Sequence, residues 1–167
     1  LVLVVVLIRR IGTMSAGTAT GAFIGYSVLN GLTLSAVFIA YTQGTIARAF
    51  FVTAGLFAIM TIFGFVTKRD LTRWGSLLGM ALLGFIIASV VNLFLRSEAF
   101  YWIITYAGVV IFVGLIAYDA QRIKEIARAG VDNPEDEQKV AVVGALRLYL
   151  DFVNLFLLLL RIFGRRR

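Results

Sequence analysis

Two of the nine acidic residues in this sequence belong to apolar stretches instead of polar connections. Asp119 follows the apolar run at residues 99–118, and Asp151 lies inside the run at residues 141–163. A carboxylate in the hydrocarbon of a membrane raises the free energy of insertion by roughly 2.5–3.5 kcal/mol, so such acids usually face a cavity or a partner and mark a pathway. Asp119 and Asp151 are therefore the candidate functional residues.

A pair of carboxylates in one cavity would respond to pH. Poor solvation and mutual repulsion favour one shared proton near neutrality. A protonated pair can be bridged by a hydrogen bond that holds two helices together, whereas a fully ionised pair repels or attracts a cation. Calcium prefers carboxylate oxygens, so Asp119 and Asp151 are also candidate ligands for a passing calcium ion. No resident cofactor is expected.

An arginine that reaches the same cavity could bind one aspartate in one state and release it in another. Arg9, Arg10 and Arg147 are the candidates for this latch. Arg9 and Arg10 have an alternative role as positive charges that anchor the membrane edge. The sequence alone leaves the choice open.

A polar stripe supports Asp151 on its own helix. The spacing of three and four residues places one set of side chains on a single helical face, which should meet protein or water: Gly144, Arg147, Asp151, Asn154, Leu158 and Arg161. One alternative is a helix lying at the interface, with Arg147 and Asp151 as a surface pair. For Asp119, the alternative is an ordinary surface pair with Arg122.

The elements that position these residues are membrane-spanning helices. Hydrophobic residues make up 60% of the 167 residues and charged residues 15%, against about 45–50% and 25% in soluble domains. Runs long enough to cross a bilayer occur at residues 18–41, 46–66, 74–95, 99–118 and 141–163. We therefore predict an all-α integral membrane protein with one domain, residues 1–167. The apolar residues 1–8 read as a partial span, so upstream helices are expected to be absent from this chain.

The connections predict the orientation in the membrane. Nine lysines and arginines fall at residues 9–10, 68–73 and 121–140, whereas Arg48 and Arg96 fall on the opposite side. The first set should be cytoplasmic, although the C-terminal run of three arginines disturbs this count. Residues 121–140 are predicted to be a long, solvated and partly helical loop. Small residues at four-residue spacing predict close helix packing at Gly17, Gly21 and Gly25, and at Gly75 and Gly79.

Composition excludes several kinds of chemistry. The sequence has no cysteine and no histidine, which removes disulfides, thiol chemistry and the common zinc sites. The net charge is +7. The basic residues lie beside apolar spans, where they would bind anionic lipid headgroups more readily than nucleic acid. The expected partners are the bilayer, protons, calcium ions and other membrane proteins.

Three motifs of the sequence are distinctive: YDAQRI at residues 118–123, LYLDFVNLF at residues 148–156 and NGLTLS at residues 30–35. In these motifs the sequence resembles the Bax inhibitor-1 family of small membrane proteins. The resemblance implies a seven-helix bundle around a central, short C-terminal helix, with a pH-dependent calcium leak as the activity. It also implies that Asp119 and Asp151 form the proton-sensing pair and that Arg9 or Arg10 is the latch. The motifs favour a bacterial member of the inner membrane.

Two other functions compete with a channel. The protein could regulate other membrane proteins without any ion flux of its own, using its glycine-rich faces. Two intramembrane aspartates also suggest an aspartyl protease, but Asp151 lacks the Gly-x-Gly-Asp context and the chain has one proline. We therefore expect no enzyme activity.

Overall fold

The computed structural model describes residues 15–130 and 133–164 of the chain. These residues form five helices: α2 (Ala16–Ala40), α3 (Gln43–Val66), α4 (Thr72–Leu95), α5 (Glu98–Ala129) and α6 (Pro134–Phe163). Each helix is long and apolar enough to cross a membrane. The predicted all-helical membrane fold is thus confirmed.

The predicted count of seven helices is not confirmed, because the described part of the chain contains five. The partial span at residues 1–8 lies outside the described residues, and so do Arg9 and Arg10. Their predicted roles stay predictions.

Short polar turns separate the helices because a side chain caps the start of most of them. Ser15, Thr42, Ser97 and Asn133 each accept a hydrogen bond from a backbone N–H in the following first turn, at 3.0–3.4 Å. These bonds satisfy N–H groups that have no partner within the helix. Pro134 occupies the first position of α6, where its missing N–H does no harm.

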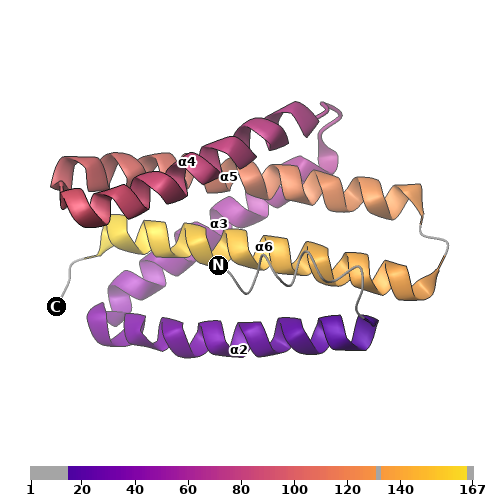
Figure 1. Cartoon of the computed structure of the whole chain (residues 1–167), viewed down its shortest axis with the longest axis horizontal. Coiled ribbons are helices and arrows are strands. Elements are labelled where there is room, and N and C mark those ends of the chain that lie inside the picture. Colours follow the sequence, from indigo (N-terminus) through magenta and orange to yellow (C-terminus); the bar gives the residue numbers. More distant parts are fainter. Residues whose placement is uncertain (1–14, 131–132, 165–167) are drawn as a thin grey trace.

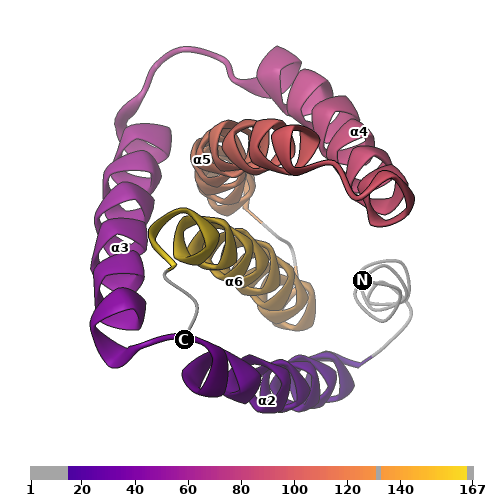
Figure 2. The same cartoon turned by 90° about the vertical axis from the view of Figure 1, so that its left-hand side faces the viewer.

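Helix α6 lies in the interior of the bundle, with α2, α3 and α5 around it (Figure 2). Helix α4 packs mainly against α5, and the five helices run with their ends at two opposite faces of the molecule (Figure 1). The C-terminal helix thus lies between other helices of the described bundle. The predicted short length is wrong, since α6 has 30 residues and α5 has 32.

The predicted loop at residues 121–140 is mostly helix. Helix α5 continues to Ala129, and α6 already begins at Pro134. Hydropathy marks only the part of a helix that lies in hydrocarbon, which is about 30 Å thick, whereas 32 residues of α-helix span about 48 Å. Both helices therefore extend beyond the hydrocarbon layer, and their polar ends meet at the same face of the bundle (Figure 1).

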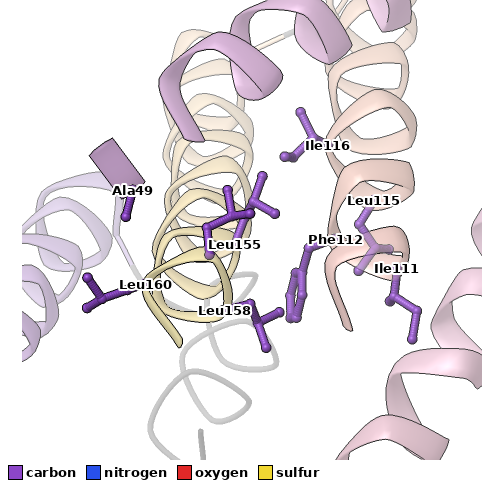
Figure 3. Packing of buried hydrophobic residues seen from close by; sticks show 9 residues of the cluster. Ala49, Ile111, Phe112, Leu115, Ile116, Leu155, Leu158 and Leu160 are labelled. Carbon is purple, nitrogen blue, oxygen red and sulfur yellow. The ribbon is translucent and has the colours of Figure 1, made fainter. Parts of the chain in front are cut away.

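The buried core lies where α3, α5 and α6 meet. Figure 3 shows apolar side chains from these helices packed together: Ala49, Ile111, Phe112, Leu115, Ile116, Leu155, Leu158 and Leu160. The outer faces are apolar as well, as in the 80% exposed Ile39 of α2 and the 83% exposed Phe94 of α4. Apolar residues on both faces are typical of helices surrounded by lipid.

Two glycines bring helices close together. A Cβ atom at Gly75 would meet the ring of Tyr118, so the predicted close packing of α4 is confirmed at this position. A Cβ atom at Gly64 of α3 would meet the backbone oxygen of Ala117 on α5, a contact that spacing did not indicate. The remaining predicted positions meet nothing within 4 Å in the described residues: Gly17, Gly21, Gly25 and Gly79.

Candidate functional site

Helices α5 and α6 bring Asp119 and Asp151 together. Asp119 is 6% exposed and Asp151 is 5% exposed. Their carboxyl groups lie close enough to repel each other when both are ionised, and to form a hydrogen bond when one of them is protonated. The predicted meeting of the two aspartates is therefore present in the fold, at the contact between α5 and α6.

One oxygen of this pair is buried without a hydrogen-bond partner. No group among the described residues donates to Oδ2 of Asp151 when both carboxyl groups are ionised. Buried carboxyl oxygens in proteins are normally bound to a donor, a proton or an ion. The pair therefore has an unused acceptor oxygen that can bind a proton or another cation.

Arg147 binds the other aspartate. Its guanidinium Nη1 donates to Oδ1 of Asp119 at 3.4 Å and so links α6 to α5. The Asp119 side chain is 8% exposed and the Arg147 side chain is 30% exposed. The alternative of a surface pair between Arg147 and Asp151 is wrong, because Asp151 is buried. The alternative of a surface pair between Asp119 and Arg122 is also wrong, because Asp119 is buried, and the Arg122 guanidinium donates to the hydroxyl of Tyr118 at 3.3 Å.

A pocket of about 340 Å³ leads to this ion pair. Asp119 and Arg147 line its inner part, and Asp136 and Lys139 line its outer part, in the first turns of α6. Lys139 also pairs with Asp136 at 3.3 Å. The pocket thus connects the polar end of the bundle to Asp119.

The family model for the inhibitor of apoptosis-promoting Bax1 matches residues 1–167 of the chain. The chain belongs to the Bax inhibitor-1 family. It is 52% identical over 168 residues to the inner membrane protein YbhL of Escherichia coli K12, covering 100% of this chain and 72% of that protein. It is 51% identical over 154 residues to an uncharacterized protein of Borreliella burgdorferi, covering 92% and 66%. It is 43% identical over 166 residues to an uncharacterized protein of Deinococcus radiodurans, covering 99% and 71%.

These relatives and the five membrane-length helices identify this Bax inhibitor-1 family member as a multi-pass protein of a bacterial inner membrane. Both the predicted family and the predicted localisation are confirmed. The roles of individual residues rest on the geometry alone.

Two polar residues that sequence reasoning missed fix α5 beside the aspartates. The buried side chain of Gln121 donates to the backbone oxygen of Arg69 at 2.8 Å and accepts from the N–H of Leu71 at 2.8 Å. The Lys124 ammonium donates to three backbone oxygens at the end of α3 and in the following turn, at 3.0–3.4 Å. Gln121 and Lys124 therefore tie α5 to the turn between α3 and α4.

The polar stripe of α6 faces protein over most of its length. Gly144 packs against Ile123 of α5, where a Cβ atom would approach the Ile123 side chain to 2.9 Å. Asn154 does not reach the aspartates, because its amide donates to the backbone oxygen of Leu150 at 2.8 Å. Of the two predicted supporting residues, only Arg147 is in contact with the pair.

Asp70 lies in the turn between α3 and α4, outside the membrane-spanning helices, and unlike Asp119 and Asp151 it is exposed. The Thr72 side chain and the Thr72 N–H, which donates to Oδ1 at 2.8 Å, lower the pKa of this carboxyl below its ordinary value of 3.8. Asp70 is therefore ionised throughout the physiological pH range.

The acidic residues of the site do not form a metal-binding cluster in the described part of the chain. Within residues 15–130 and 133–164, no group of three or more acidic side chains is placed so that it could hold a metal ion. Stable calcium sites use six to eight oxygens.

Proposed function

We propose that this Bax inhibitor-1 family member is a pH-sensitive calcium leak channel in which Asp119 and Asp151 sense protons. The observation that carries the proposal is a pair of buried carboxyl groups, of which Asp119 binds the guanidinium of Arg147 at the end of a pocket. Intramembrane acids in such surroundings commonly belong to ion or proton pathways.

Charge balance explains how the site would respond to pH. One guanidinium, one carboxylate and one protonated carboxyl group together carry no net charge, which is the favourable state in a medium of low dielectric constant. Protonation of Asp119 would remove the negative charge that Arg147 binds. Arg147 could then turn into the pocket, and α5 and α6 would lose their ion pair.

The proposed leak therefore increases as the pH falls from 8 to 6. A hydrogen bond within the protonated pair would instead hold α5 and α6 together at low pH and so reduce the leak. In our proposal the ion pair with Arg147 is the stronger effect, because charge-assisted hydrogen bonds are roughly twice as strong as neutral ones. In this proposal, calcium ions are the cargo and no cofactor takes part.

The experiment is calcium flux into liposomes that contain only the purified protein, measured at pH 6, 7 and 8. The wild type should carry calcium, more at pH 6 than at pH 8. Asp119→Asn removes the charge that binds Arg147 and should raise the flux at pH 8. An absence of flux at every pH would contradict the channel.

The alternative is a regulatory protein of the membrane that carries no ions. The observation in its favour is the open glycine face of α2, where Gly17, Gly21 and Gly25 meet nothing within 4 Å in the described part of the chain. In that case, liposomes would show no flux, and Gly21→Leu would weaken capture of a partner helix. Protease activity is disfavoured because Arg147 occupies a carboxylate that would have to activate water.

A further inference from the structure

A second pocket, of about 430 Å³, lies on the other side of α5 from the aspartate site. It is formed by the end of α3, the turn between α3 and α4, and the polar end of α5. Its charged lining residues are four basic and two acidic side chains: Lys68, Arg69, Lys124, Arg128, Asp70 and Glu125. The pocket therefore carries an excess of positive charge.

Three of these basic side chains are not used by the fold. Lys124 is bound to backbone oxygens, and Asp70 accepts from the backbone of Thr72. By contrast, the side chains of Lys68, Arg69 and Arg128 form no hydrogen bond or ion pair with any described residue. Three cationic groups are thus free to bind an anion at one pocket.

The rim of the same pocket is apolar. Phe65 is 43% exposed and Val66 is 72% exposed at the last turn of α3, and both line the pocket. This turn is where the apolar helix meets its polar connection, at the depth of the lipid headgroups. A small soluble anion would gain nothing from the apolar rim, whereas a lipid would contact both parts.

We propose that this pocket binds the phosphate headgroup of an anionic phospholipid in the cytoplasmic leaflet. Lys68, Arg69 and Arg128 bind the phosphate, and the acyl chains lie against Phe65 and Val66. Basic pockets between membrane helices bind anionic lipids in this way, and arginine binds phosphate through paired N–H groups. The site is separate from Asp119 and Asp151, so it does not depend on the proposed channel activity.

The alternative role of these residues is orientation by bulk charge, which needs no defined site. The two roles differ in position dependence. A binding site loses affinity only when the pocket residues change, whereas bulk charge depends on the number of charges near the membrane surface. Arg48 and Arg73 offer a matched control, because both are exposed and neither lines this pocket.

The test is binding of phosphatidylglycerol to the purified protein in detergent, with phosphatidylcholine and inorganic phosphate as separate probes. Wild type should bind phosphatidylglycerol in preference to phosphatidylcholine and show no saturable binding of inorganic phosphate at the same concentrations. R69Q/R128Q should bind phosphatidylglycerol at least about tenfold more weakly, whereas R48Q/R73Q, with the same net charge, should bind like wild type.

Three results would overturn the proposal. They are equal binding by both double variants, no preference of the wild type for phosphatidylglycerol, and binding of inorganic phosphate as tight as that of the lipid. The melting temperature of each variant, measured without added lipid, identifies any loss of fold. If R69Q/R128Q is unfolded, the single variants R128Q and R73Q replace the doubles under the same criteria.

Discussion

A guanidinium beside two carboxyl groups sets the charge of the contact between α5 and α6. Sequence spacing placed Arg147 and Asp151 on one face of a helix, four residues apart, and this part of the prediction needed only helix geometry. It could not reveal that Arg147 crosses to Asp119, because that depends on how α6 is rotated against α5. For the same reason, the neighbouring Arg122 was a plausible partner until the fold showed it bonded to Tyr118.

The ion pair between Asp119 and Arg147 should stabilise the fold by a measurable interaction energy. In a double-mutant cycle of Asp119→Asn and Arg147→Gln, we expect an interaction energy of about 1 kcal/mol or more, since coupled polar neighbours give roughly 0.5–3 kcal/mol. The measurement is the free energy of unfolding in detergent for the wild type, both single variants and the double variant. Additive effects of the two substitutions would show that the pair contributes nothing to stability.

Helix α5 is the element that organises the site, since it packs against α3, α4 and α6. Hydropathy located all five described helices, because the apolar length of a membrane span is easily recognised. Hydropathy missed the polar ends of α5 and α6, where Gln121 and Lys124 connect α5 to the end of α3 and the α3–α4 turn. Those contacts join residues 50 to 60 positions apart in sequence, and no local pattern indicates them.

The crossing of α3 and α5 should depend on the absence of a side chain at Gly64. Gly64→Ala places a methyl group against Ala117 and within 2.9 Å of the Ala120 Cβ atom. We expect a loss of about 1–3 kcal/mol in the free energy of unfolding, as for other overpacked contacts. Gly55→Ala on the same helix is the control, because it meets nothing within 4 Å and should be neutral or stabilising by up to about 1 kcal/mol. Equal effects of the two substitutions would contradict the close crossing.

The contact of Gln121 should protect the turn between α3 and α4. Gln121→Leu leaves the N–H of Leu71 and the backbone oxygen of Arg69 without their partner, a loss of about 1–3 kcal/mol in local stability. Trypsin should then cleave after Lys68 or Arg69 roughly tenfold faster, because the open turn is more populated. The exposed Gln138 offers the control Gln138→Leu, and equal cleavage rates in the two variants would refute the prediction.

At the scale of the whole molecule, the distribution of charge predicts the orientation in the inner membrane. The end that carries the two candidate pockets also carries the basic turns, so it should face the cytoplasm. The sequence contains no cysteine, which permits labelling of single introduced cysteines.

A membrane-impermeant maleimide should label Glu98→Cys in intact cells and Ala129→Cys only after the cells are broken. Both positions are exposed, and they lie at opposite ends of α5. The reverse pattern would place the aspartate pocket on the outer side and would contradict the predicted orientation.

The pH profile of calcium flux through liposomes that contain Asp119→Asn tests the central claim most directly, because protonation of Asp119 is the proposed step that releases Arg147. Asp70→Asn is the matched control, because its lowered pKa keeps Asp70 ionised above pH 5 and its contribution to the turn is lost only in more acidic solution. We predict that flux rises from pH 8 to pH 6 in the wild type and in Asp70→Asn, and that it is high and independent of pH in Asp119→Asn. An unchanged pH profile in Asp119→Asn would contradict a proton sensor formed by Asp119 and Asp151.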